Sequence, residues 1–124
     1  MTGTSVDGLD LALIEVSPPK NVDLARESIS ILNAQTIPLP EKLRDALLAC
    51  GQPDQSSVDL LGECDVQLGD FIGASIIDWL RSLDISLASI RAIGSHGQTV
   101  RHRPPGTRDS AFTLQIGDPN QIAE

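Results

Sequence analysis

Aromatic residues are scarce in this 124-residue chain, which contains two phenylalanines, one tryptophan and no tyrosine. Its core must therefore be built from aliphatic side chains. The same scarcity removes the aromatic platforms on which single-stranded nucleic acids stack. The sequence also lacks any apolar run near the roughly 18 residues of a membrane span, and no charged-then-apolar leader opens it. We therefore expect a soluble cytoplasmic protein with no membrane partner.

Cysteine is equally rare, with Cys50 and Cys64 as the two examples. They form no C-x-x-C pair and have no histidine nearby to complete a zinc set. Both lie in apolar helical patterns, which predicts buried thiols in a reducing cytoplasm. A disulfide or a reactive thiol is the alternative.

Basic residues are outnumbered, with 9 Lys and Arg against 17 Asp and Glu and a net charge of −8. A chain this acidic is repelled by phosphate backbones, which argues against a nucleic-acid partner. The charge is uneven, because residues 1–90 carry five basic and fourteen acidic side chains whereas residues 91–124 carry four and three. The second stretch also holds both histidines, so it is the better place for an anion to bind.

The length suits a single domain, and the apolar pattern predicts an α/β fold. Strand patterns cover Leu9–Val16, Ser28–Ile37, Ile90–Ile93, Thr99–His102 and Ala111–Ile116. We expect the first two to form a hairpin and the last two to form a second pair. The third is short and apolar, which predicts a buried strand that ends at Gly94.

Two longer segments predict helices. Pro40–Cys50 has proline at its start and Gly51 just past its end, the asymmetry that is typical of a helix. A longer amphipathic helix is expected to begin after Ser56 or Ser57 and to end near Leu83. This second helix contains Gly62, Gly69 and Gly73, each of which weakens it by up to ~1 kcal/mol relative to alanine. The glycines permit close packing against a neighbour or mark a kink, and the sequence leaves both open.

The first ten residues predict a turn that binds phosphate. Gly3 and Gly8 free the backbone, and hydroxyl side chains lie between them. A standard P-loop is excluded, because Leu9 and Asp10 replace its Lys-Ser/Thr pair and a strand pattern follows. A phosphate-binding turn between two strands remains, with Mg²⁺ needed to offset the charge of Asp7 and Asp10. The alternative is an ordinary hairpin turn.

A second candidate site is the segment Gly94-Ser-His-Gly-Gln-Thr99. If a strand ends at Gly94, the segment lies where open α/β sheets bind ligands. His96, Gln98 and Thr99 can then donate and accept hydrogen bonds toward a polyhydroxylated ligand. A histidine bonded locally in a turn is the alternative, and a Ser-His hydrolase lacks a third catalytic partner.

The last part of the chain contains a basic segment and a turn. Arg101, His102, Arg103 and Arg108 form a basic loop, which is either solvated or holds an anion. Asp118-Pro119 predicts the N-cap and first position of a closing helix.

Taken together, these segments resemble one family, the anhydro-N-acetylmuramic acid kinases. The opening M-T-G-T-S-V-D-G-L-D is similar to the family's M-S-G-T-S-x-D-G-x-D, with Thr2 keeping the hydroxyl of the usual serine. Later blocks match in the same order: L-P-E-K-L-R, E-C-D-V-Q-L-G, I-G-S-H-G-Q-T-V-R-H-R-P and F-T-L-Q-I-G-D-P-N-Q-I-A-E. The G-S-H-G-Q-T block is highly specific.

The resemblance implies an actin/Hsp70/hexokinase-like ATPase fold, with two ribonuclease-H-like lobes and a mixed sheet covered by helices. It implies a kinase that uses ATP and Mg²⁺ to phosphorylate O6 of 1,6-anhydro-N-acetylmuramic acid, while water opens the anhydro ring, in peptidoglycan recycling. The ATP-phosphate loop would then consist of Gly3, Thr4, Ser5, Val6, Asp7, Gly8, Leu9 and Asp10. Asp7 would hold the metal through water, and His96, Gln98 and Thr99 would face the sugar.

The resemblance also implies that residues 1–124 are an incomplete N-terminal lobe. The family's D-F-R block and its general-base aspartate would lie beyond Glu124, so no catalytic residue is assigned and the isolated chain is not expected to catalyse. A non-catalytic ligand-binding or interaction module is the alternative. An apolar lobe face left exposed would favour self-association, which makes a homodimer an expectation.

Overall fold

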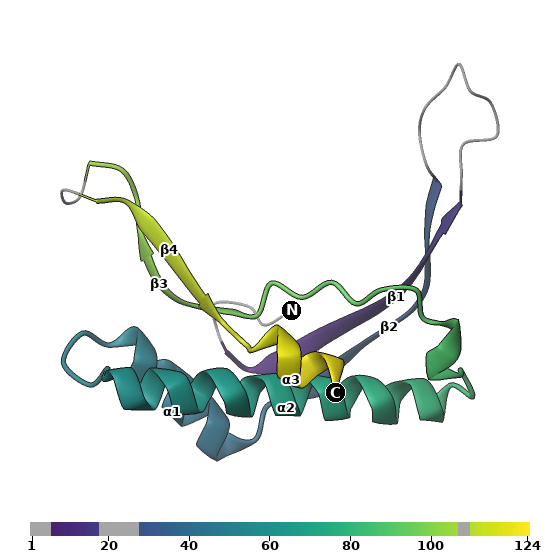
Figure 1. Cartoon of the computed structure of the whole chain (residues 1–124), viewed down its shortest axis with the longest axis horizontal. Helices are drawn as coiled ribbons and strands as arrows, with labels where there is room; N and C mark the ends of the chain where they lie inside the picture. The colour runs from purple at the N-terminus through teal and green to yellow at the C-terminus, as the bar shows by residue number, and fades with distance from the viewer. Residues whose placement is uncertain (1–5, 18–27, 107–109) are drawn as a thin grey trace.

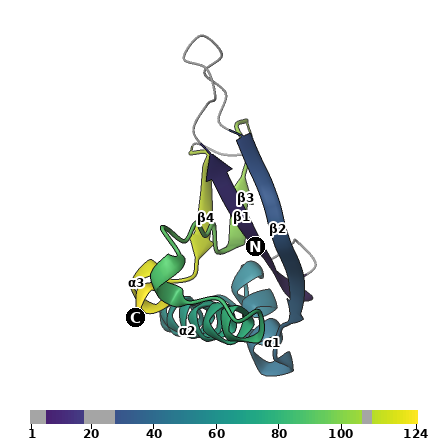
Figure 2. The same ribbon diagram turned by 90° about the vertical axis from the view of Figure 1, so that its right-hand side faces the viewer.

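Two antiparallel hairpins stand on a layer of helices in the computed structural model, which describes residues 6–17, 28–106 and 110–124. The elements in chain order are β1 (Gly8–Ser17), β2 (Ser28–Pro38), α1 (Glu41–Gly51), α2 (Val58–Ser82), the 3-10 helix η1 (Leu87–Ser89), β3 (Gln98–Arg103), β4 (Phe112–Ile116) and α3 (Pro119–Ala123). Figure 1 shows α2 along the base, the two hairpins diverging above it, and α3 lying on it. In Figure 2, α1 and α2 form the lower layer and the strands stand above them.

The β1–β2 hairpin presents its two faces to different surroundings. Leu9 pairs with Ile37 on the face that packs into the core, and Leu9 is only 2 % exposed. The register shifts at a bulge between Leu13 and Ile14, so Leu32 is left without a partner residue in the ladder.

The opposite face of this hairpin carries three apolar cross-strand pairs: Ala12–Ala34, Ile14–Ile31 and Val16–Ile29. We call these six residues the apolar ladder. All six are exposed, and Ile31 reaches 70 %. Successive strand residues point to opposite faces, so a strand that faces the core with one set leaves the other set outside.

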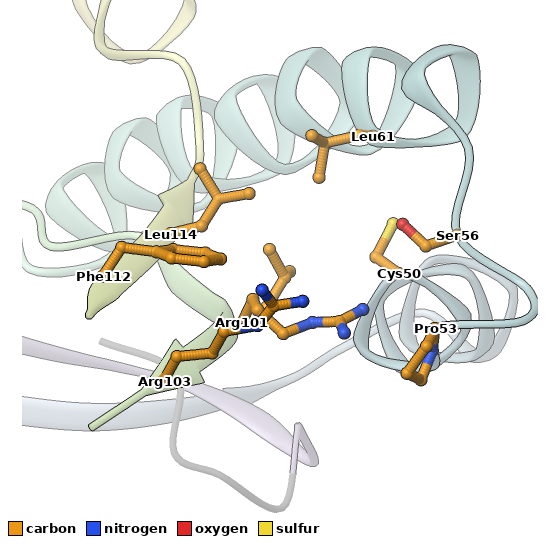
Figure 3. A pocket seen from close by; sticks show the side chains of 9 residues that line it. Cys50, Pro53, Ser56, Leu61, Arg101, Arg103, Phe112 and Leu114 are labelled. Carbon is orange, nitrogen blue, oxygen red and sulfur yellow. The ribbon is translucent and has the colours of Figure 1, made fainter. Parts of the chain in front are cut away.

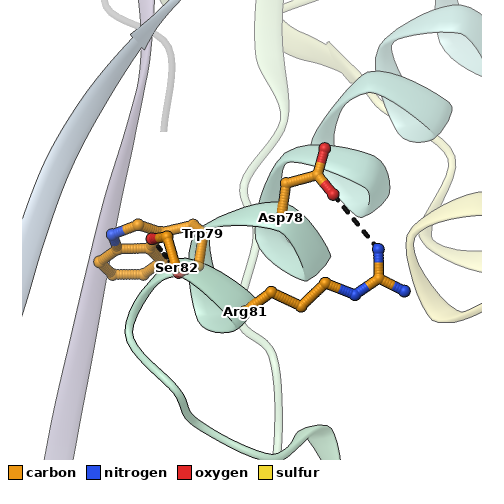
Figure 4. Close-up of polar contacts among 4 residues, drawn as sticks. All are labelled: Asp78, Trp79, Arg81 and Ser82. Carbon is orange, nitrogen blue, oxygen red and sulfur yellow. Dashed lines mark hydrogen bonds and ion pairs between the residues drawn. The ribbon is translucent and has the colours of Figure 1, made fainter.

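The helices begin and end within one residue of the positions that the sequence signals predict, and α1 includes Gly51, which was expected just past its end. Pro40 precedes α1, and the Ser57 hydroxyl accepts the Leu60 N–H at 3.0 Å as the N-cap of α2. Near the end of α2, the Ser82 hydroxyl donates to the Trp79 carbonyl at 2.6 Å (Figure 4). A second contact there joins Arg81 to Asp78 at 3.4 Å, with both side chains largely exposed (Figure 4). Both predicted helices are thereby confirmed.

The C-terminal elements also follow their predicted order. β3 and β4 pair antiparallel, as expected, with an irregularity between Thr99 and Arg101. Asp118 caps α3, because its carboxylate accepts the Asn120 N–H at 2.8 Å and Pro119 occupies the first turn. α3 packs on α2, while β3 contacts α1 and β4 contacts α2.

The core is aliphatic, as the scarcity of aromatics predicts. Its buried members come from both hairpins, from all three α-helices and from the segments that precede β1 and α1: Val6, Leu9, Leu39, Leu43, Leu47, Cys50, Cys64, Leu68, Ile72, Val100, Ile116 and Ile122. Among the described residues, no helix is both long and apolar enough to cross a membrane.

Two expectations about strands are wrong in detail. Ile90–Ile93 is no strand: residues 90–97 form no regular structure, and Ile93 is 46 % exposed. A strand is held by hydrogen bonds to a neighbour, and the described residues form only the β1–β2 and β3–β4 ladders. The α/β class is confirmed, but the described strands make two separate two-stranded antiparallel sheets in place of one mixed sheet.

Candidate functional site

The predicted phosphate turn is described from Val6 onward, since Gly3, Thr4 and Ser5 lie outside the described residues. Val6 has a φ of +53° and a side chain only 4 % exposed. A β-branched residue in this left-handed region is strained, and such strain persists only where packing enforces it. Here the core holds the Val6 side chain, which keeps the Val6 backbone in this conformation. A left-handed residue is one of the backbone arrangements from which anion-binding turns are built.

Asp7 and Gly8 connect this turn to the rest of the fold. The Leu39 N–H donates to the Asp7 carbonyl at 3.4 Å, which joins the turn to the segment that leads into α1. A Cβ at Gly8 would lie 2.7 Å from the Thr36 side chain, so glycine permits the close approach of the two strands. The strand that the sequence predicts after the turn is confirmed as β1.

The last two residues of the predicted loop have different surroundings. Leu9 is 2 % exposed and packs in the core, so only its backbone can contact a phosphate. Asp10 is exposed, and its carboxylate accepts the Thr36 hydroxyl at 2.6 Å. Asp10 is therefore held against β2.

Asp7 and Asp10 are the candidate ligands for Mg²⁺ in the predicted phosphate turn. Asp7 and Asp10 offer the oxygen ligands that Mg²⁺ prefers. Among the described residues, no three His, Cys, Asp or Glu side chains lie together as a metal-binding group. Beside substrate phosphates Mg²⁺ is usually bound through one or two carboxylates and keeps several waters, so the chemistry of Asp7 and Asp10 suits it.

The second candidate segment lies at the start of a strand. The expected position at the carboxyl end of a strand is wrong, because residues 90–97 are irregular and Gln98 opens β3. His96 is exposed, Thr99 is half-buried and Gln98 is 4 % exposed. Within the described part of the chain, His96 makes no hydrogen bond to a carboxylate, which argues against the Ser-His hydrolase. Ser95 instead accepts the Gly97 N–H at 3.1 Å.

Gln98 carries an unsatisfied acceptor. Its Nε2 donates to the Thr99 carbonyl at 3.1 Å, while its buried Oε1 has no hydrogen-bond partner among the described residues. A buried acceptor without a donor costs about 1–3 kcal/mol. Such an atom favours a hydroxyl or amide donor supplied from outside the described residues.

Gly97 fixes the position of this segment against β4. Its φ is +62°, and a Cβ there would lie 1.9 Å from the Ile116 carbonyl oxygen. No other residue fits without displacing the backbone. Gly117 lies against the Gly97 Cα, and its N–H donates to the Asp65 carboxylate of α2 at 2.6 Å. Sequence reasoning missed this role of Asp65.

Two of the three glycines of α2 fit the first of the interpretations that the sequence left open, close packing against a neighbour. A Cβ at Gly69 would lie 2.8 Å from the Asp118 carbonyl oxygen, and one at Gly73 would lie 3.3 Å from that of Gln121. These two glycines permit close packing of α3 and of the turn before it. Gly62 meets nothing within 4 Å and has no such role.

Both cysteines are buried free thiols, as expected. Burial raises the pKa of Cys64 from 9.0 to about 12, and hydrogen bonding with Cys50 and the nearby Glu63 charge contribute further. The Cys64 thiol therefore stays protonated at neutral pH, and a protonated thiol is a poor nucleophile.

Part of the expected basic loop is strand. Arg101, His102 and Arg103 belong to β3, and Arg108 lies outside the described residues. The His102 ring is joined to the Thr113 hydroxyl of β4 at 2.9 Å.

The two candidate segments are attached to one core. Val6 and Leu9 from the first pack in the same cluster as Val100, which follows the second. The same core therefore holds Val6 and Leu9 of the first segment and the strand residue Val100 that follows the second.

Comparison with known proteins points to one family. The family model described as anhydro-N-acetylmuramic acid kinase matches residues 1–124. Similar relatives with that name include proteins of Coxiella burnetii (42 % identical over 123 residues), Saccharophagus degradans (39 % over 124) and Xanthomonas campestris (40 % over 125). The alignments cover 99 to 100 % of this chain but only 30 to 31 % of each relative. The chain therefore spans under a third of the length of these relatives.

Proposed function

The chain belongs to the anhydro-N-acetylmuramic acid kinase family, and from this premise we propose that it forms the N-terminal part of a sugar kinase. The kinase transfers the γ-phosphoryl group of ATP to O6 of 1,6-anhydro-N-acetylmuramic acid, while a water molecule opens the anhydro ring at C1. The products are ADP and N-acetylmuramic acid 6-phosphate, which places the reaction in peptidoglycan recycling. The described elements belong, in this proposal, to a ribonuclease-H-like lobe of an actin/Hsp70/hexokinase-like fold.

The turn Gly3–Asp10 contacts the phosphates of ATP in this proposal. The strained backbone at Val6 supports it, because such outliers cluster at ligand-binding sites. Bound Mg²⁺ would neutralise phosphate charge, and Asp7 would hold it through water. Asp10 contributes negative charge from a position set by Thr36.

The sugar is contacted by His96, Gln98 and Thr99. The observation that carries this assignment is the buried Gln98 Oε1, which lacks a donor within the described residues. A sugar hydroxyl can supply that donor. His96 is exposed and can reach the same ligand from the preceding turn.

The reaction also needs a general base to activate the attacking water, and we place it in the part of family proteins that this chain does not span. A polypeptide of these 124 residues is therefore expected to show no turnover, because the loss of a general base alone typically costs ~10²–10⁴ in rate.

The activity is tested in a chimaera in which these residues replace the matching 30 % of the Coxiella burnetii relative. We expect ATP-dependent formation of the 6-phosphate from the anhydro sugar, measured by coupled ADP release and mass spectrometry. A folded chimaera that phosphorylates no anhydro sugar contradicts the proposal, as does parent-like turnover by the 124-residue polypeptide.

The sugar assignment is tested separately by His96→Ala in the chimaera. Calorimetry is expected to show a loss of roughly 1–3 kcal/mol in sugar binding, the size of one unpaired hydrogen-bonding partner. ATP affinity is expected to stay unchanged. Equal losses for both ligands would mean that His96 supports the fold and does not contact the sugar.

Asp7→Asn tests the phosphate side. The variant is expected to raise the KM for ATP and to weaken the dependence of the rate on magnesium, because one anionic oxygen is removed. Unchanged kinetics across a magnesium titration would leave the turn with a structural role only.

A non-catalytic ligand-binding module is the second candidate, with the buried Gln98 Oε1 as an acceptor for its ligand. It predicts that the 124-residue polypeptide binds the anhydro sugar without ATP. The kinase proposal predicts measurable sugar affinity only in the chimaera.

We also propose that the 124-residue polypeptide self-associates through the apolar ladder. Ile29, Ile31 and Val16 are each more than half exposed, which is unusual for a paired aliphatic row. Light scattering is expected to detect dimers that Ile31→Lys dissociates; a monomer at every concentration contradicts this.

A further inference from the structure

A groove of about 300 Å³ lies between the β3–β4 hairpin and the segment that joins α1 to α2. Arg101 and Arg103 line it from β3, Phe112 and Leu114 from β4, and Ser56 from the joining segment. Figure 3 shows both guanidinium groups directed into the space between the hairpin and the helices. The volume is at the lower end of the range for small-molecule sites.

The two arginines share a face of β3 because they are two residues apart. Both are half-buried. Neither has a carboxylate within 4.0 Å in the described part of the chain, where the ion pair of Arg81 with Asp78 is the one recorded. This is unusual in a chain with 17 acidic and 9 basic residues. Two guanidinium groups directed at one space repel each other, and an anion between them removes that cost.

The groove also holds one guanidinium in place. The Arg103 Cζ lies 5.1 Å from the centre of the Phe112 ring, a cation–π contact that restricts the side chain. The ring and Leu114 provide an apolar wall. The Ser56 hydroxyl adds a neutral donor on the opposite side of the groove.

Guanidinium groups bind carboxylate and phosphate oxygens in a planar, two-pronged manner. Because the groove also has an apolar wall, it favours a ligand that has an apolar part as well as a charged group. We propose that this groove binds a small organic anion, with its carboxylate or phosphate on Arg101 and Arg103 and its apolar part against Phe112.

The groove lies next to the segment that we assign to the sugar but is lined by other side chains. On β3 its lining consists of Val100, Arg101 and Arg103, whereas His96, Gln98 and Thr99 are assigned to the sugar. Thr99 and Arg101 are two residues apart, so the displacement experiment described below is what separates the two sites.

The test is a titration of the 124-residue chain, and of the chimaera described above, with phenyl phosphate, benzoate and inorganic phosphate. Circular dichroism establishes that each protein is folded. We expect saturable binding by calorimetry, with inorganic phosphate the weakest because it lacks the apolar part. Preference for phenyl phosphate or for benzoate identifies the charged group.

Arg101→Gln and Arg103→Gln are each expected to weaken phenyl phosphate binding at least tenfold. The matched control is Arg81→Gln, which removes the same charge from the exposed pair on α2 and is expected to change the Kd less than twofold. Phe112→Leu is expected to weaken phenyl phosphate while leaving inorganic phosphate unchanged.

Three results overturn the proposal. The first is an absence of saturable binding in both folded proteins. The second is an equal loss of phenyl phosphate affinity in Arg81→Gln, which would show that the effect comes from net charge alone. The third is displacement of phenyl phosphate by the anhydro sugar in the chimaera, which would make the groove part of the substrate site. Failure of the chimaera to phosphorylate sugar leaves all three readouts intact.

Discussion

Asp65 of α2 holds the turn that precedes α3 through two hydrogen bonds. Its carboxylate accepts the Gly117 N–H at 2.6 Å, and its carbonyl oxygen accepts the Asp118 N–H at 3.1 Å. Gly117 in turn lies against Gly97, the residue between His96 and Gln98. A helix residue distant in sequence thus positions the segment that we assign to the sugar.

Replacing Asp65 tests this relationship. Asp65→Ala is expected to lower the free energy of unfolding by about 1–3 kcal/mol, because the partly buried Gly117 N–H loses a charged acceptor. Asp65→Asn keeps an oxygen in place and is expected to cost less. Urea denaturation gives the values, with Asp70→Ala as the control because Asp70 is an exposed residue of the same helix. Equal effects at both positions would contradict the role of Asp65.

Gly97→Ala is expected to be strongly destabilising, by at least about 2 kcal/mol, since it combines a left-handed backbone with overlap of the Ile116 carbonyl. Gly94→Ala is the matched control, because a Cβ there meets nothing within 4 Å. Thermal unfolding of the two variants separates them. Equal melting temperatures for the two variants would contradict the prediction.

Two alanine substitutions within α2 are expected to change the free energy of unfolding in opposite directions. Gly62→Ala should stabilise by about 0.5–1 kcal/mol through helix propensity, as no neighbour is met. Gly69→Ala should destabilise despite the same propensity gain, because its Cβ would lie 2.8 Å from the Asp118 carbonyl oxygen. Stabilisation by both would show that α3 does not pack closely on Gly69.

Stability is expected to fall in alkaline solution because of Cys64. Its pKa is raised to about 12 in the folded chain from 9.0, so the folded state keeps a proton that the unfolded state loses. The unfolded state then binds fewer protons, and the free energy of unfolding decreases as the pH rises above about 9. Urea midpoints at several pH values should show this slope, and Cys64→Ala should flatten it. Parallel slopes in both proteins would contradict the assignment.

The helices were predictable because their signals are local. Pro40, Ser57 and Asp118 mark helix starts through the geometry of their own or adjacent residues, and each one lies where the sequence indicates. The hairpins follow for a similar reason, since strand pairs close in sequence need little more than a turn between them.

The errors lie where distant segments decide the outcome. Ile90–Ile93 has a strand-like composition, but a strand requires a partner that composition cannot reveal. Asp65 lies 52 residues from Gly117, and nothing in its neighbours indicates a contact with that turn. The i, i+2 spacing of Arg101 and Arg103 was a usable signal, since it places both on one face of a strand.

The apolar ladder of the β1–β2 hairpin has a consequence for the chain before it folds. Ser28–Ile37 contains no charge and no proline and is rich in isoleucine, which is the composition of segments that stack into cross-β fibrils. Folding does not hide this row, because Ile29 and Ile31 stay on the surface of the hairpin. Slow refolding at high concentration is therefore expected to seed fibrils from β2, and Ile31→Lys is expected to delay that seeding while leaving the helical core unchanged.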